Sequence, residues 1–531
     1  MTRVGVDVSV RRQRGASSKP HDEKDAVRTA NTTFRLSTTS NRSQRGLLSL
    51  KRNFHTRTKW AYALRTQAIV LRNAFGSVAC AWLANACYSL GNVFSGKPSQ
   101  DQSRSELIVA NSLWATITFC LVVLFARLPF MLPLRFIDAP DSKPTVWLCL
   151  KKLIRGTFVY FIVTLAVMLG WSSFVAYLVS IKPFVFKYKL DCYVGTLSTH
   201  GFFTGITLAA KRIYYRETCQ GRERVIRVRS TTTTTSNTVS DSRPEAILSI
   251  KFWRAYIKGF PKSTPAALAG AFVHILSQQR IMEQNAMVLT LFVIGSTLFK
   301  LVIQESTKHY ILQKRIRNIK FMCAAVALPT VLIDTQTRII LLGIKNTQLV
   351  AMGTLGMAFA EIFLRFGKAG LIMRTIRSRE DNLFAARSSN LAIIPRQSVS
   401  SIEDTSPSSV RVDFELWRRR LHAYHVAEIN ADTYAEYIAI GCSVSILFFF
   451  GDHPHYSLLR QSDSMNHRST QLKMLLFQVV VEIVVDFVST LLEMMAGIEF
   501  ELIKNLGPFL MVLFMVTAVL NINISVGIYL F

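Results

Sequence analysis

Long apolar segments alternate with short polar and basic segments along most of the chain. The apolar segments are about 14 to 26 residues long, and a helix of about 20 residues crosses the roughly 30 Å hydrocarbon core of a bilayer. Because backbone groups in lipid must be satisfied within each segment, the pattern predicts an all-α, polytopic transmembrane bundle of about eleven spans, or nine at the least. The candidates are Ala68 to Gly91, Leu107 to Ala126, Gly156 to Ile181, Cys192 to Ala210, Thr264 to Ser277, Ala286 to Ile303, Phe321 to Ile344, Leu349 to Leu364, Tyr434 to Phe450, Met474 to Gly497 and Pro508 to Phe531.

Two of these candidates, Cys192 to Ala210 and Thr264 to Ser277, are weaker candidates for spans than the others. The sequence does not decide whether either of them crosses the membrane completely. Lys and Arg beside a span are retained on the cytoplasmic side, so their distribution tests the threading. With eleven spans and a cytoplasmic amino terminus, inner Lys and Arg outnumber outer ones by roughly five to one. Omitting Thr264 to Ser277 would move the basic cluster between Lys308 and Lys320 outside. We therefore predict an integral membrane protein with a cytoplasmic amino terminus. The sequence does not identify which membrane holds it.

The spacing of the candidate spans divides the chain into six segments. Three of them hold the spans, in groups of about four, four and three. The other three are polar and are predicted to be cytoplasmic. In order, the segments are a basic, largely disordered tail (1–65), the first transmembrane group (66–210), a basic Thr-rich loop (211–262), the second group (263–364), a Ser-rich loop (365–433) and the third group (434–531).

The distribution of the basic residues indicates a membrane, and not a nucleic acid, as the partner of the chain. The 531 residues include 63 Lys and Arg against 33 Asp and Glu, a net charge of +30. The basic residues flank apolar segments and do not interleave with aromatic residues on a soluble module, so no nucleic acid is expected. Anionic lipids at the basic cytoplasmic segments are the expected partners, since each basic residue there contributes about 1 kcal/mol. In the Ser-rich loop, an interfacial amphipathic helix is predicted from Phe414, Trp417, Leu421 and Tyr424.

One predicted span carries three acids. In Met474 to Gly497, a rotation of about 100° per residue places Glu482, Asp486 and Glu493 on one face. Two ionised acids near the bilayer centre cost about 5 to 7 kcal/mol, and the aliphatic and Phe residues of the helix return about 4 to 8 kcal/mol. The favourable and unfavourable free energies of inserting this helix therefore nearly cancel, and neither central acid can face lipid as an anion.

Two uses of these acids follow from the same chemistry. Burial and a like-charged neighbour both disfavour two full negative charges, which favours a shared proton or a bound cation, as in transporters. Alternatively, the acids pair with polar groups of other helices and lock the bundle, with Arg338 and Lys300 as available partners. Asp334 lies four residues before Arg338, so these two are expected to pair with each other. Glu361 and Glu436 fall near predicted inner ends and are expected to reach the interface.

Motifs for catalysis or cofactor binding are absent from the sequence. No phosphate loop, nucleophile elbow, zinc-protease motif or dinucleotide fingerprint occurs, so no cofactor or metal is expected and an enzyme is disfavoured. The leading hypothesis is a secondary transporter or permease-like protein that moves an unidentified small solute or ion with a coupling proton or cation at Glu482, Asp486 and Glu493. The alternative is a non-transporting receptor or scaffold in which these acids are structural. A membrane enzyme of an unrecognised type comes third.

Overall fold

The described part of the structure, a computed structural model, is helical and contains no β-strand. It comprises residues 44–138, 142–232, 252–260, 264–278, 286–314, 316, 318–342, 347–392, 407–456, 464–495 and 506–530. The chain divides into two units, residues 1–58 and 59–531, and the described residues of the first unit form only the beginning of α1. All contacts below lie within the second unit. Most of the basic tail and the centres of the Thr-rich and Ser-rich loops lie outside the described residues.

The helices match the predicted apolar segments closely. The α-helices are α1 (Gln44–Ser89), α2 (Arg104–Met131), α3 (Val146–Ile181), α4 (Leu190–Glu217), α5 (Cys219–Thr232), α7 (Phe252–Gly259), α8 (Thr264–Gln278), α9 (Ala286–Gln313), α10 (Ile319–Leu342), α11 (Thr347–Ala392), α12 (Pro407–Phe450), α13 (Ser464–Met495) and α14 (Gly507–Tyr529), with 3₁₀ turns at Ser99–Asp101 and Pro183–Tyr188.

Seven of the described helices are long and apolar enough to cross a membrane: α2, α3, α10, α11, α12, α13 and α14. This set confirms the predicted all-α bundle and is that of a multi-pass integral membrane protein. The count of about eleven spans is not confirmed. The other four candidates lie in α1, α4, α8 and α9, which do not reach the same length and composition, and α8 has only 15 residues.

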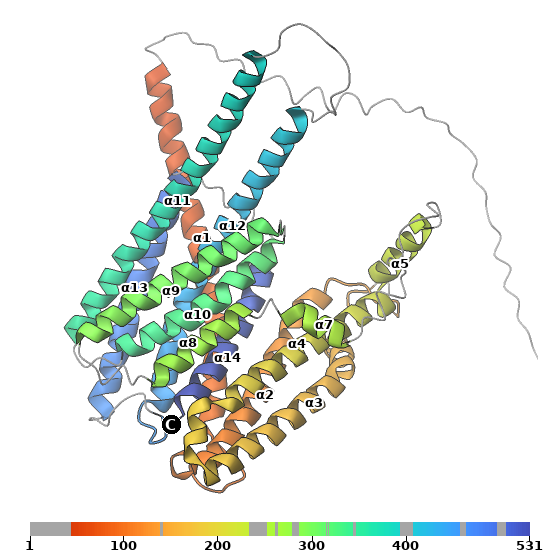
Figure 1. Cartoon of the computed structure of the whole chain (residues 1–531), viewed down its shortest axis with the longest axis vertical. Helices are drawn as coiled ribbons and strands as arrows, with labels where there is room; N and C mark the ends of the chain where they lie inside the picture. Colours follow the sequence, from red (N-terminus) through yellow and green to blue (C-terminus); the bar gives the residue numbers. More distant parts are fainter. Residues whose placement is uncertain are drawn as a thin grey trace, which may run out of the picture. The chain divides into compact units, whose positions relative to one another are not determined.

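The interior of the bundle is built around α10 and α12. These two helices pack along each other, while α2, α3 and α4 form a second packed group that α14 joins through α2 (Figure 1). The core between them includes Tyr424, Ile438 and Phe514, and the Tyr434 ring stacks on the Phe514 ring with centroids 4.6 Å apart. Large apolar side chains also point outward, as expected for a surface that faces lipid: on α3, Phe158, Val159, Ile162, Val163 and Val167 are exposed.

The two helices that flank the Ser-rich loop are longer than their apolar segments. α11 has 46 residues and α12 has 44, so each extends about 66 to 69 Å, more than twice the roughly 30 Å hydrocarbon core. The expected loop (365–433) is therefore helical at both ends. The predicted interfacial helix is instead the first part of α12. Phe414 and Leu421 are buried in one cluster with Ile372 and Ile376 of α11, and Tyr424 is buried in the central core.

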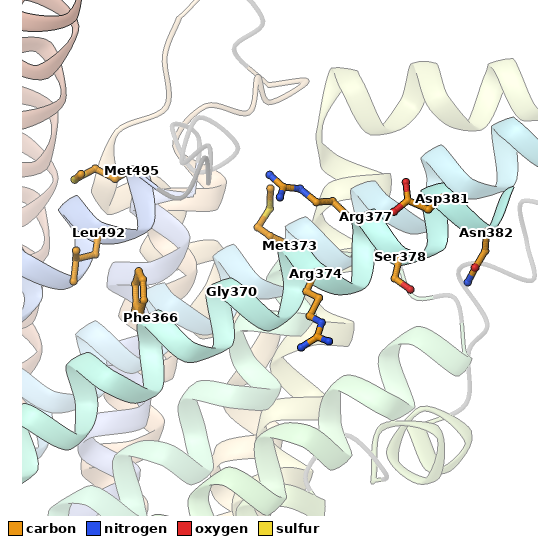
Figure 2. Close-up of a pocket in the computed structure, with 10 residues that line it drawn as sticks. All are labelled: Phe366, Gly370, Met373, Arg374, Arg377, Ser378, Asp381, Asn382, Leu492 and Met495. Atoms are coloured by element: carbon orange, nitrogen blue, oxygen red, sulfur yellow. The ribbon is translucent and has the colours of Figure 1, made fainter. Parts of the chain in front are cut away.

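An open groove of about 960 Å³ runs along α11 beside the carboxyl end of α13. One end is apolar and the other is polar, as Figure 2 shows. Its lining consists of Phe366, Gly370, Met373, Arg374, Arg377, Ser378, Asp381 and Asn382 from α11 and of Leu492 and Met495 from α13.

Candidate functional site: a buried acid cluster

Helix α13 turns its polar side inward and its apolar side outward. Glu482, Asp486 and Glu493 are each less than 5% exposed, whereas Val480 and Val484 are more than half exposed. A soluble protein would have the opposite arrangement, since its exposed faces are polar. The three acids predicted to share one helix face therefore lie on the buried face of the bundle.

Two arginines meet these acids. Arg338 of α10 donates from Nη2 to Glu482 Oε2 at 3.3 Å. Arg365 of α11 donates from Nη1 to Asp486 Oδ1 at 2.8 Å and from Nε to Glu493 Oε1 at 3.2 Å. Both guanidinium groups are less than a tenth exposed, so these are desolvated ion pairs. Removing one partner from such a pair leaves an uncompensated buried charge, at a cost of about 3 to 5 kcal/mol.

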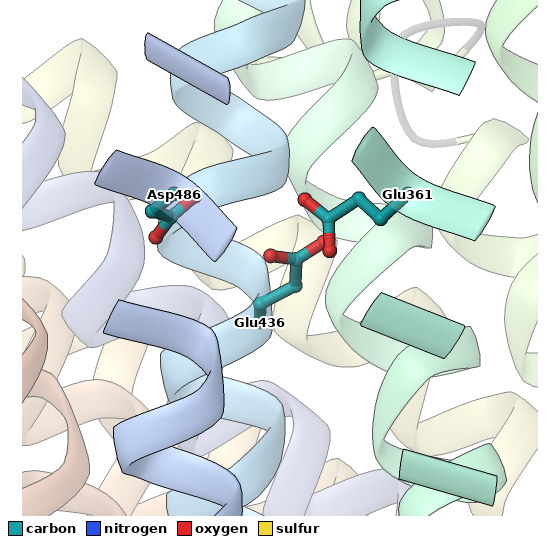
Figure 3. Close-up of side chains that lie close together, drawn as sticks. All are labelled: Glu361, Glu436 and Asp486. Atoms are coloured by element: carbon teal, nitrogen blue, oxygen red, sulfur yellow. The ribbon is translucent and has the colours of Figure 1, made fainter. Parts of the chain in front are cut away.

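Two further carboxyl groups complete the cluster. Glu361 lies one turn before Arg365 on α11 and accepts a hydrogen bond from its Nη1 at 3.2 Å. Glu436 comes from the middle of α12, and its carboxyl group faces that of Glu361, with Asp486 on the other side (Figure 3). One carboxylate oxygen from each of these three residues lies within 4.8 Å of the others. We name Glu361, Glu436, Glu482, Asp486 and Glu493 the acid cluster.

Several polar atoms of the cluster lack a partner. Within the described part of the chain, Glu436 Oε2, Glu482 Oε1 and Glu493 Oε2 are buried and accept no hydrogen bond. Glu436 also forms no ion pair with a described residue and is only 4% exposed. Buried polar atoms are nearly always satisfied, so neighbouring carboxyl groups with free oxygens are suited to take up a proton or a cation.

A second ionic group lies beside the acid cluster. Lys300 of α9 contacts Asp334 at 2.9 Å and Asp432 at 3.7 Å. Lys368 of α11 contacts Glu428 at 2.9 Å. Gln304 joins the two lysine sites, because it donates to Asp432 at 2.7 Å and accepts from Lys368 at 2.7 Å. We name this group the lysine network; its three acids and two lysines are almost balanced.

Charge is much less balanced in the acid cluster. Among the described residues, its five carboxyl groups form ion pairs only with Arg338 and Arg365, and the charge of Lys300 in the lysine network also acts on Glu436 and Glu482. The idealised cost of burying an uncompensated ion is many kcal/mol, so such groups bind a proton or a counterion instead. The cluster can therefore hold protons, a cation, or both.

The structure pairs the sequence-predicted residues differently in two places. Asp334 and Arg338 do not pair with each other: Asp334 contacts Lys300, and Arg338 contacts Glu482. The i,i+4 expectation was wrong because packed helices on other sides of α10 supply partners. Glu436 does not reach the interface either, because α12 continues beyond its apolar segment and keeps this residue inside the bundle.

Four of the interacting side chains were assigned to the Ser-rich loop from sequence: Arg365, Lys368, Glu428 and Asp432. A periodic signal was present, since Glu428, Asp432 and Glu436 recur every four residues and so share one helix face. Applied to α12, that spacing would have predicted a buried acidic stripe extending into the loop.

Comparisons with known proteins give no assignment. No family model matches the chain, and neither a curated protein nor a solved structure is detectably similar to it.

Proposed function

We propose that the protein is a secondary transporter or permease-like protein in which the acid cluster binds a coupling proton or cation. The observation that carries the proposal is the excess of five carboxyl groups, four of them buried, over two arginines. Intramembrane acids in such numbers are typical of proton relays and cation sites. We interpret the burial of four of the five acids as an occluded state of such a transporter.

The contact between Glu361 and Glu436 is the preferred proton site. Two carboxyl groups can share a hydrogen bond only when one of them is protonated, because carboxylates only accept. Glu436 has no arginine of its own, whereas Glu482 and Asp486 are neutralised by Arg338 and Arg365. This places the labile proton next to the ion pairs and not within them. Loss of that proton would add a negative charge that competes for Arg365.

Proteoliposomes test the proposal. Full-length protein is reconstituted with an internal pH-sensitive dye, and proton flux and the uptake of a solute panel are measured with and without pH, sodium and potassium gradients. We expect gradient-driven flux in the wild type and its loss in Glu436→Gln. Glu305→Gln is the matched control, because Glu305 is an exposed acid of α9 paired only with Lys308. Wild-type vesicles as tight as protein-free vesicles under every gradient would contradict transport, and so would an unchanged Glu436→Gln variant.

The second candidate is a receptor or scaffold in which the acids are structural. The ion pairs of Arg338 and Arg365 favour it, since they close three of the acids against bases. The described groove along α11 also includes none of the acid cluster in its lining. This candidate predicts no flux in any variant, together with a loss of stability whenever an ion pair is broken. A cytoplasmic amino terminus remains part of either proposal.

A further inference from the structure

The groove along α11 changes from apolar to basic over the length of a lipid molecule. Phe366 and Met495 at its apolar end are 52% and 74% exposed, and the partly buried Leu492 lies at the same end. Arg374 and Arg377 lie two to three turns further along α11, at a distance of about 12 to 17 Å. Figure 2 shows both arginines beyond the apolar end, followed by Asp381 at the far end of the groove.

The two arginines carry charge that no ion pair with a described residue neutralises. Among the described residues, neither Arg374 nor Arg377 has an ion-pair partner, and Asp381 is not joined to them by one. Other bases of α11 differ. Arg365 is held by three acids, Lys368 by Glu428, and Arg379 lies 4.3 Å from the centroid of the Trp417 ring. Two adjacent arginines without acids are suited to a phosphate group, which guanidinium binds through directed hydrogen bonds.

The apolar end fixes what kind of phosphate compound fits. Leu492 and Met495 lie in the last turn of α13, where its apolar stretch ends. Phe366 directly follows Arg365, the arginine that pairs with the acid cluster. A free phosphate would gain nothing from these exposed apolar side chains. An acyl chain would bury them, and basic sites between spans at a headgroup level are suited to anionic lipids.

We propose that this groove is a binding site for an anionic phospholipid. The phosphate lies at the basic end that Arg374 and Arg377 line, and an acyl chain lies over Phe366, Leu492 and Met495. The proposal is independent of transport, because none of these residues belongs to the acid cluster.

Photo-crosslinking in nanodiscs of phosphatidylcholine tests the site. Full-length protein is incubated with phosphatidylglycerol that carries a diazirine in its acyl chain, and labelled peptides are identified by mass spectrometry. We expect adducts on peptides that contain Phe366, Leu492 or Met495. Excess unlabelled phosphatidylglycerol should suppress them, whereas added phosphatidylcholine or inorganic phosphate should not. The double variant Arg374→Gln, Arg377→Gln should weaken binding about thirtyfold, given about fivefold for each base.

The matched control is Arg222→Gln, Arg224→Gln, which removes two exposed arginines of α5. It should label as the wild type does, and both double variants should unfold at the wild-type temperature because all four residues are exposed. Suppression by phosphatidylcholine to the same extent would overturn the proposal in favour of general acyl contact. Suppression by inorganic phosphate alone would overturn it in favour of a simple anion site. Equal labelling of the Arg374, Arg377 variant and the wild type, or equal loss in the α5 control, would also overturn it.

Discussion

At the scale of single residues, the same side-chain type has different roles according to its neighbours. Glu482 and Glu436 are both 4% exposed and lie in adjacent helices, yet only Glu482 contacts an arginine. Glu482 therefore compensates a buried positive charge, whereas Glu436 compensates none. Replacement of each by glutamine separates the two roles, because glutamine has the shape of a protonated glutamate and carries no charge.

Glu482→Gln is expected to destabilise the protein by about 3 to 5 kcal/mol, because Arg338 is left buried and unpaired. Glu436→Gln is expected to change stability by less than about 1 kcal/mol, since no base loses its partner. Thermal unfolding of both variants in the same detergent measures the difference. Equal losses for the two variants would show that Glu436 is ionised and compensated like Glu482.

At the scale of helices, close approach depends on small residues at particular positions. Gly441 of α12 faces Val78 of α1, and a Cβ atom built on Gly441 would overlap both methyl groups of Val78. Small residues allow the backbones of membrane helices to approach each other, which gives the van der Waals contact that holds such helices together.

Gly441→Ala is expected to destabilise the protein by about 1 to 3 kcal/mol, because the added methyl group would overlap the branched Val78 side chain and force it or the helices to shift. Gly356→Ala on α11 is the matched control, since no atom lies within 4 Å of its built Cβ. That control should be neutral or stabilising by up to about 1 kcal/mol. Thermal unfolding compares the two, and a control that loses as much as Gly441→Ala would refute the packing explanation.

The turn after α12 carries a buried histidine outside the spanning segments. His453 is 7% exposed, and its Nε2 atom lies 3.1 Å from Ser99 Oγ. Burial, reinforced by His455, lowers the pKa of His453 below its ordinary value of 6.5. In the unfolded chain the imidazole takes up its proton near that ordinary value, so protonation stabilises the unfolded state first.

Stability is therefore expected to be full above about pH 6.5 and to fall as the pH decreases through that value toward the lower pKa of the folded protein. His453→Gln should flatten this part of the profile, whereas His455→Gln, in the same turn but less buried, should not. Unfolding temperatures measured between about pH 5 and pH 8 test this. A wild-type profile that His453→Gln leaves unchanged would mean that another group controls the acid limb.

At the scale of the whole molecule, hydropathy predicted the architecture well. Every candidate span overlaps a described helix over most of its length, because a long apolar segment in lipid has few alternatives to a helix. Hydropathy could not say how many helices cross, since α4, α8 and α9 are shorter or more polar than a complete span. It also missed that α11 and α12 continue as helices beyond their apolar segments, where polar residues are stabilised by tertiary contacts.

The candidate site was predicted only in part for a related reason. The shared face of Glu482, Asp486 and Glu493 follows from helical geometry, so it could be read from one segment. Partner choice is a property of several helices together: Arg365 and Glu436 lie 71 residues apart in sequence and enter the same cluster from different helices. No local pattern contains that information.

The central claim is that the acid cluster holds a proton because its carboxyl groups outnumber its arginines. Infrared spectroscopy of the protein in lipid at neutral pH measures this directly, since a protonated carboxyl group has a carbonyl stretching band that a carboxylate lacks. We expect this band in the wild type and in Glu305→Gln, and a clear loss of its intensity in Glu436→Gln. A wild-type spectrum without a protonated carboxyl band, or a band that Glu436→Gln leaves intact, would contradict the account.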